Sequence, residues 1–317
     1  MSYKDITEYK NSSTVCDPMH SWGGTWTEDK LDTFEKYVKA YLTIMNKYRD
    51  KNNWKLIYFD GFAGSGSRTE NAEKETELEK NLFDANYIID EEKDSYKGAA
   101  ERVLNIDIRG FDYYYFIDKD KESNDKLKEK LSSHTDATRI LEFRANDANL
   151  ELGNLSEAMH KYCNLAAMVL LDPFGMQIDW DSIRQLEGTR TDIWILVPTG
   201  VIINRLLDRK AELKHIDLLK RFFGEDETFI REYFFEKRTR NTLFGEEEIV
   251  VKVNNSIQKI ADLYISKLQT IFKYVTTEAL VLRNSRNIPI FHFVFASNNE
   301  SAKKIASQII GKKRSSL

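Results

Sequence analysis

The chain has 317 residues, a mass of 37.1 kDa, 41% hydrophobic residues and a net charge of −4. This size and apolar content suit one large domain with a sizeable core, and a pI near 5.9 argues against a dedicated non-specific nucleic-acid binder. Two cysteines argue against a disulfide framework or a Cys-rich metal site. No stretch is long and apolar enough to span a membrane and the first residues are polar, so we expect a cytoplasmic protein.

The first expected elements are an irregular lead-in, a long amphipathic helix in TWTEDKLDTFEKYVKAYLTIMNKYR and a buried strand over 54–60. A glycine-rich turn follows at 61–66. Ten acidic and four basic residues then lie in 68–95, which predicts a solvated acidic insertion and leaves the remainder of the chain slightly basic.

Near-continuous apolar strands are predicted at 112–118, 139–147, 166–172 and 192–200, with amphipathic helices between them. This alternation is typical of a parallel sheet covered by helices on both faces. The charged stretch 201–277 breaks the rhythm and predicts a helical insertion. Two closing strands, 278–284 and 288–297, precede a basic C-terminal helix.

The expected organisation therefore has four parts. They are a lead-in and covering helix (1–53), a ligand-binding core (54–200), a helical insertion (201–277), and a closing strand pair with the basic C-terminal helix (278–317).

Acidic residues follow four successive predicted strands. Ligands of open α/β sheets bind beyond the carboxyl ends of the strands, so these acids are the candidate site residues. They are Asp60, Asp118, Asp147 and Asp172. Any one of them could instead cap a helix or belong to a turn, since Asp is common in both roles, but four at one sheet edge fit that explanation less well.

The turn after the first strand predicts a close approach of backbone and ligand. Gly64 and Gly66 remove side chains from the place where a nucleoside cofactor would lie, and an acid after the second strand, such as Asp118, can accept hydrogen bonds from ribose hydroxyls. A third-strand acid such as Asp147 could accept the exocyclic amine of an adenine. The turn lacks the full G-x-G-x-x-G spacing, which makes a nicotinamide-dependent oxidoreductase the weaker alternative.

The segments DGFAGSG, FIDKD, ANDAN and DPFG, in this order, resemble motifs I to IV of S-adenosylmethionine-dependent methyltransferases. The first is especially similar to the FAGSG turn of the methyltransferases that act on amino groups of adenine or cytosine. The resemblance implies a Rossmann-like class I methyltransferase fold with a seven-stranded, mostly parallel sheet, and S-adenosylmethionine as cofactor.

Five longer segments are similar to the three-Cys-motif partner proteins, a bacterial family known as TcmP with a methyltransferase-like domain. They are WTEDKLDTFEKYVKAY, YFDGFAGSG, YYFIDKD, LLDPFGMQIDW and IFHFVFASNNESAKKI. Genes for these proteins lie beside a gene for a separate three-cysteine protein, which makes that protein the expected partner.

The resemblance implies a role for each matched residue. Asp60, Gly64 and Gly66 would surround the methionine part of the cofactor, Asp118 the ribose and Asp147 the adenine, and Phe62 would also belong to the cofactor site. Asp172 and Pro173 would lie beside the transferred methyl and orient an attacking amine, and an aromatic residue would stack on an extruded base.

The fourth motif departs from the methyltransferase pattern, because Phe174 replaces the second proline and Gly175 the aromatic residue. Phe174 is thus either the stacking residue or a core or lid residue. We expect N-methylation of a nucleic acid or of a product of the partner protein. The alternative is a partner or binding protein that keeps the fold without catalysis.

Other candidates are weaker. Arg205 after the fifth strand could meet an anionic substrate or form a surface ion pair. The five histidines show no metal-ligand spacing, and His292, which alternates with phenylalanines, is expected to be a sheet residue.

Overall fold

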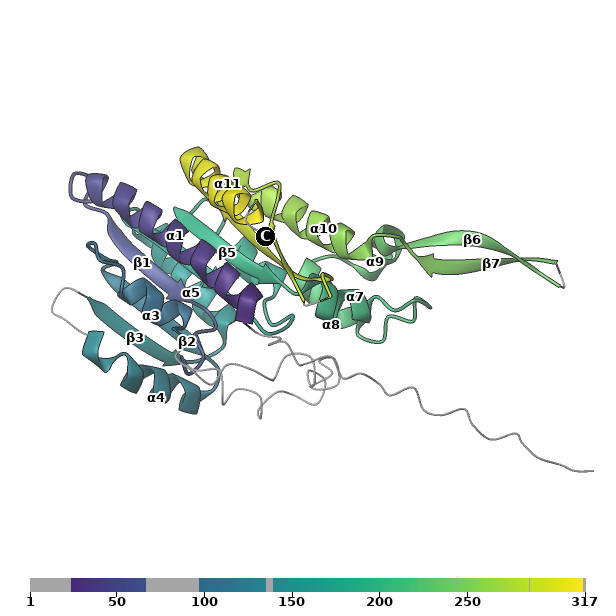
Figure 1. Cartoon of the computed structure of the whole chain (residues 1–317), viewed down its shortest axis with the longest axis horizontal. Coiled ribbons are helices and arrows are strands. Elements are labelled where there is room, and N and C mark those ends of the chain that lie inside the picture. The colour runs from purple at the N-terminus through teal and green to yellow at the C-terminus, as the bar shows by residue number, and fades with distance from the viewer. Residues whose placement is uncertain (1–23, 67–96, 135–138, 244, 285, 316–317) are drawn as a thin grey trace, which may run out of the picture.

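The computed structural model describes residues 24–66, 97–134, 139–243, 245–284 and 286–315 (Figure 1). The lead-in before residue 24 and the expected acidic insertion 68–95 lie outside these ranges. No described helix combines the length and the apolar character needed to cross a membrane.

The core of the molecule is a mixed, mostly parallel sheet in the order β3-β2-β1-β4-β5-β10-β8, with β9 also paired to β10. The strands of the segment β3-β2-β1-β4-β5 are parallel to one another, whereas β10 is antiparallel to β5. The strands are β1 (Lys55–Asp60), β2 (Tyr113–Asp118), β3 (Ile140–Ala145), β4 (Leu165–Leu171), β5 (Thr191–Val197), β8 (Tyr274–Val275), β9 (Leu280–Arg283) and β10 (Pro289–Ser297).

This sheet has eight strands where the sequence predicts seven. The difference lies at one edge, because β8 pairs with the end of β10 and β9 with its beginning and middle. The expected α/β class, with a mostly parallel sheet and covering helices, is confirmed.

Helices cover both faces of the sheet. They are α1 (Gly24–Tyr48), α3 (Ala99–Leu104), α4 (Lys121–Lys130), α5 (Ala148–Lys161), α6 (Trp180–Arg184), α7 (Asn204–Leu206), α8 (Ile216–Phe223), α9 (Glu227–Phe234), α10 (Ser256–Ile271) and α11 (Glu300–Arg314), with short helical turns η3 (Ser132–His134) and η4 (Thr199–Ile203). Figure 1 shows α1 and α11 side by side over the sheet, where Lys313 and Asp29 form an ion pair of 2.6 Å.

Two buried clusters follow from the alternation of side chains along the strands. In β1, Leu56 and Tyr58 face α1, α3, α4 and α11, whereas Ile57 and Phe59 face α5, α6 and α8 to α10. The strand is buried on both faces, which explains its continuous apolar sequence.

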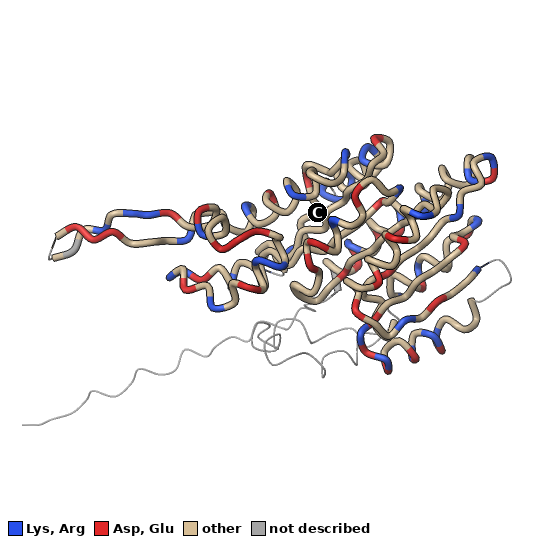
Figure 2. Tube along the Cα trace, turned by 180° about the vertical axis from the view of Figure 1, so that it is seen from behind, with Lys and Arg blue, Asp and Glu red and all other residues tan. Residues whose placement is uncertain are grey.

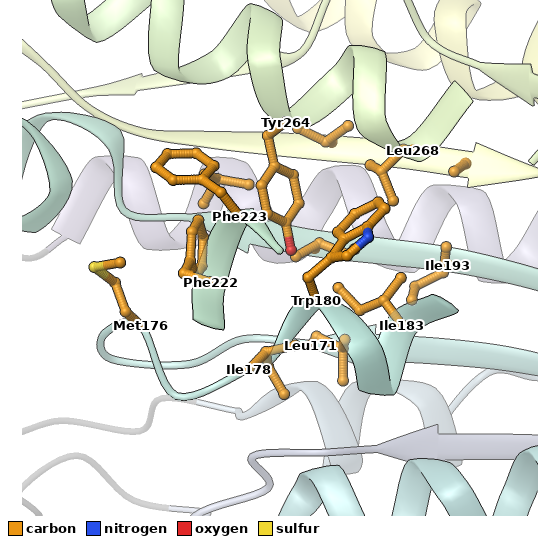
Figure 3. Close-up of a cluster of buried hydrophobic side chains, with 14 of the residues drawn as sticks. Leu171, Met176, Ile178, Trp180, Ile183, Ile193, Phe222, Phe223, Tyr264 and Leu268 are labelled. Atoms are coloured by element: carbon orange, nitrogen blue, oxygen red, sulfur yellow. The ribbon is translucent and has the colours of Figure 1, made fainter. Parts of the chain in front are cut away.

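The second of these faces includes a cluster of aromatic residues beyond the end of β4 (Figure 3). Trp180 at the start of α6 lies edge-on to Tyr264 of α10 with ring centroids 6.0 Å apart, and Phe222 of α8 stacks on Tyr264 at 5.0 Å. This packing joins the helices after β5 to the sheet.

The segment 201–277, predicted to be a mostly helical insertion, contains helices α7 to α10 but also strands that the sequence analysis did not predict. Strands β6 (Phe235–Thr242) and β7 (Gly245–Lys252) form an antiparallel hairpin that projects from the body (Figure 1). Its charged residues of both signs are seen in Figure 2. Most of its side chains are exposed, so the strands lack the apolar face by which strands are recognised in a sequence.

Candidate functional site at the sheet switch point

The strand order reverses between β1 and β4. From β1 the chain continues through β2 to β3 on one side, and β4 and β5 are added on the other side of β1. Ligands of open α/β sheets bind outside the carboxyl ends of the strands at such a reversal. Asp60 ends β1 and Asp172 directly follows β4, so the structure places both acids at this point.

The glycine turn folds back over the ends of β1 and β2. The amide of Ala63 donates to the carbonyl of Ile117 at 2.8 Å, and the amide of Gly64 donates to Asp118 Oδ2 at 2.9 Å. Gly64 has a φ of 60°, in the left-handed region that glycine occupies without a steric cost. The turn therefore lies against the β2 acid itself, and a close approach of its backbone to a ligand stays a prediction.

Gly66 is favoured by its conformation, and its surroundings leave little room for a side chain. Its φ is 71°, and an added Cβ would lie 2.8 Å from Leu127 Cδ1. Lys130 Nζ donates to the carbonyl of Gly66 at 2.6 Å. The end of the turn is thus held against α4 by a lysine of that helix.

Asp118 is fixed at the end of β2 by two backbone donors. Besides Gly64, the amide of Asp120 donates to its Oδ1 at 2.8 Å. Partial burial raises the pKa of Asp118, although both amide hydrogen bonds oppose that rise. Each carboxylate oxygen keeps a second lone pair, so the group can still accept hydrogen bonds from a ligand hydroxyl.

Asp147 serves as the N-cap of α5. Its Oδ1 accepts from the amide of Asn149 at 2.8 Å and from the Asn149 side-chain amide at 3.0 Å. Lys119 Nζ lies 3.8 Å from its other oxygen. Asp147 and Asp118 end neighbouring strands, and contact of Asp147 with an adenine stays a prediction.

Asp60 is the most perturbed acid of the site. It is 2% exposed and accepts hydrogen bonds from the Tyr58 hydroxyl at 3.0 Å and the Phe62 amide at 3.3 Å. Burial raises its pKa to about 7, and the negative charge of Asp172 adds to that rise. Lys30 and the two hydrogen bonds oppose it. The pKa of the β1 acid is therefore much closer to neutral pH than that of an ordinary aspartate.

Asp172 forms an ion pair with Lys30 of α1. Lys30 is 5% exposed, and its Nζ lies 5.6 Å from the ring centroid of Trp26. Helix α1 therefore also places a positive charge at the switch point, which is the reversal of strand order between β1 and β4.

Pro173 is buried, whereas Phe174 is 48% exposed. This exposure excludes a core position for Phe174, and the stacking and lid roles stay predictions. The residues that the fourth motif predicts for the site are together at the end of β4.

Sequence reasoning missed Lys30 and Tyr58. Lys30 precedes the buried Phe34 by one helical turn, so it continues the apolar stripe of α1 where a solvated lysine is not expected. That spacing indicates that Lys30 is buried. In the sequence Tyr58 looks like an ordinary core residue, and only its hydrogen bond to Asp60 in the structure distinguishes it.

Two other predictions can be compared with the structure. His292 is a buried residue of β10, as expected, and burial lowers its pKa to about 4. Its Nδ1 lies 2.8 Å from the Thr199 hydroxyl. Arg205 is exposed on α7.

A surface depression lies elsewhere, at the amino ends of β2 and β3. Asn105, Asp107, His134 and Arg139 contribute to its lining. It is on the edge of the sheet opposite to the acids, so it is no part of the candidate site. The described residues contain no group of His, Cys, Asp and Glu arranged to hold a metal ion.

No protein-family model and no curated protein matches the chain. A solved structure, the precorrin 8W decarboxylase encoded by gene MT0146 of Methanobacterium thermoautotrophicum, matches at 14% identity with a TM-score of 0.21, over 49% of this chain and 73% of the other. A likeness this slight supports no statement about fold or function.

Proposed function

We propose that the chain is an S-adenosylmethionine-dependent methyltransferase of the class I fold. The observation that carries the proposal is the Gly64–Asp118 hydrogen bond, which joins the glycine turn to the β2 acid beside the reversal of strand order. A nucleoside bound there would meet bare turn backbone and a carboxylate held in position, and this combination suits a ribose. The parallel order β3-β2-β1-β4-β5 and the resemblance of the four motifs support the same reading.

Within this proposal the residues divide by their place. Gly64, Gly66 and Phe62 belong to the cofactor side of the switch point, with Asp60 beneath them. Asp172 and Pro173 belong to the acceptor side, where a carboxylate oxygen and a backbone carbonyl can accept the hydrogens of an amine. Those hydrogen bonds would aim the nitrogen lone pair at the methyl carbon. The cofactor would supply an electrophilic methyl on sulfur. The carbon–sulfur bond would break as the nitrogen–carbon bond forms, which leaves S-adenosylhomocysteine, and the nitrogen would lose one proton to water or to a carboxylate such as Asp172.

The exposure of Phe174 supports one class of acceptor. A half-exposed aromatic ring at the end of β4 can stack on a flat heterocycle, which supports an amino group of a nucleic-acid base as acceptor. A product of a three-cysteine partner protein is the other acceptor that the family resemblance suggests. We place the reaction in the cytoplasm.

The Lys30–Asp172 ion pair favours a second candidate function. An acceptor amine would compete with this lysine for the Asp172 carboxylate. A protein that binds the cofactor without catalysis and acts through a three-cysteine-motif partner would keep such a pair permanently.

Calorimetric titration with S-adenosylmethionine and S-adenosylhomocysteine tests the cofactor site. We expect binding by the wild type, and its loss in Gly64→Leu and in Asp118→Ala. The matched control is Asp217→Ala on α8, whose side chain is 90% exposed in the described structure. Equal binding by all four proteins, each shown to be folded by thermal unfolding, would disprove the proposed site.

A second assay separates the two functions. Transfer of a labelled methyl group to single-stranded or double-stranded nucleic acid, or to the partner and its products, would show catalysis. Cofactor binding without transfer to any of these acceptors would favour the binding protein.

A further inference from the structure

Lys30 is a buried cation at the reversal of strand order. It extends from α1 to the end of β4, with only 5% of the residue exposed. Removing an ammonium group from water is costly unless charged or polar groups replace its hydration. A lysine in the apolar stripe of a covering helix therefore calls for an explanation beyond packing.

Lys30 has more hydrogen-bond donors than acceptors among the residues that the structure describes. An ammonium group has three N–H donors. Within the described ranges, the Asp172 carboxylate is the sole hydrogen-bond partner of Nζ, and the Trp26 ring at 5.6 Å supplies a further, non-directional attraction. Among the described residues, two of the three donors have no acceptor, and an acceptor from a ligand can use them.

The access to this cation is through its partner. The Asp172 side chain is 23% exposed, although that of Lys30 is 6% exposed. A ligand that reaches the outer side of Asp172 can therefore come next to Lys30.

The charges around Lys30 indicate which charged groups such a ligand has. Asp172 and Lys30 act on the ionisation of Asp60 in opposite senses, so the three groups share one electrostatic environment. Two carboxyl groups and one ammonium suit a ligand that has a cationic group for the acids and an anionic oxygen for the lysine. The α-ammonium and α-carboxylate of an amino acid have this combination.

We propose that Lys30 binds the carboxylate of an amino-acid moiety at the switch point, by donating a charge-assisted hydrogen bond to one of its oxygens. The amino-acid end of the cofactor is one source of this group, and a free or peptide-terminal amino acid on the acceptor side is the other. The first source rests on the proposed function, and the second does not.

Two ligands that differ only in the amino-acid end distinguish the sources. S-adenosylhomocysteine and 5′-methylthioadenosine are both nucleoside thioethers, and the second lacks the amino acid. In Lys30→Met we expect S-adenosylhomocysteine to bind roughly 10- to 100-fold more weakly, the loss typical of one hydrogen bond to a charged group, with unchanged affinity for methylthioadenosine. The matched control is Lys39→Met on the exposed side of α1, which should leave both affinities unchanged.

Other results assign the second source or overturn the inference. If S-adenosylhomocysteine binds wild type and Lys30→Met equally, methionine is titrated into both proteins with S-adenosylhomocysteine present. Binding to the wild type alone places the amino acid on the acceptor side. If neither ligand distinguishes the two proteins, Lys30 has a structural role only and the inference fails.

The inference and the proposed function can fail separately. A wild type that binds neither S-adenosylhomocysteine nor methylthioadenosine refutes the proposed function, and titration with methionine alone still decides the role of Lys30.

Lys30→Met leaves Asp172 without its cation, which could impair folding. The double variant Lys30→Met/Asp172→Asn removes both charges, and the ratio of the two thioether affinities should fall in it as in the single variant. Lys30→Arg should restore the ratio in part.

Discussion

The raised pKa of Asp60 predicts that this carboxyl group lowers the stability of the protein as the pH rises. Its pKa is about 7 in the folded protein, against the usual value of 3.8 that applies to the unfolded chain. Between these values the folded state binds more protons than the unfolded state. The free energy of unfolding therefore falls as pH rises from about 4 to about 7, and is constant above that as far as Asp60 is concerned.

The magnitude follows from the two pKa values. A difference of one pKa unit corresponds to about 1.4 kcal/mol, so ionised Asp60 costs the folded state about 4 kcal/mol at pH 8, of which about 3 kcal/mol develops above pH 5. Asp60→Asn cannot ionise, and its amide oxygen can still accept from Tyr58 or Phe62. Relative to wild type, the variant should gain about 3 kcal/mol in free energy of unfolding between pH 5 and pH 8.

Urea unfolding of both proteins at pH 5, 6, 7 and 8 measures this difference. Asp192 also has a pKa raised by burial, to about 6, and contributes to the decline in both proteins, so its effect cancels in the comparison. The exposed Asp217→Asn is the control and should run parallel to wild type. A difference between Asp60→Asn and wild type that does not change with pH would refute the assignment of a raised pKa to Asp60.

Three further predictions concern packing and the hairpin. In Gly200→Ala the new Cβ would lie 2.0 Å from the backbone carbonyl oxygen of Pro289, so we expect a loss above about 3 kcal/mol in urea unfolding, and a smaller loss would show that η4 moves freely. Trp180→Ala removes a 5%-exposed side chain from the cluster of Figure 3 and should cost about 3–5 kcal/mol in the same assay, with a smaller cost expected if α8 collapses into the space. Replacing 237–250 by a short Gly-Ser turn should leave the urea midpoint unchanged, because the hairpin is largely exposed; a lowered midpoint would mean that it supports the body.

The central strands could be predicted because each is buried on both faces and bounded by helices. The strand expected at 54–60 is β1 (Lys55–Asp60), and the one expected at 192–200 is β5 (Thr191–Val197), which ends earlier because Thr199–Ile203 forms a helical turn. The common location of the acids at the strand ends could also be predicted, since parallel strands bring their carboxyl ends to one edge of the sheet. For these parts local pattern and tertiary environment agree.

The hairpin and the partner of Lys30 could not be predicted from the same signals. The strands of the hairpin owe their pairing to each other and to the turn between them, and their exposed charged residues show no strand period. Lys30 depends on a partner 142 residues away in the chain. Periodicity identifies which face of a helix is buried, but it does not identify the group that a buried charge will meet.

The position of β10 has a consequence for synthesis of the protein. All seven residues of β5 are buried, and its free edge is covered only when β10 pairs with it. On the ribosome the chain emerges from its N-terminus, so β5 is complete long before residues 289–297 appear. During that interval the nascent chain presents an apolar strand with unpaired backbone, the kind of edge that recruits strands from other molecules. Yield in a cell should therefore respond to the rate of translation between β5 and β10 and to chaperones that cover such edges.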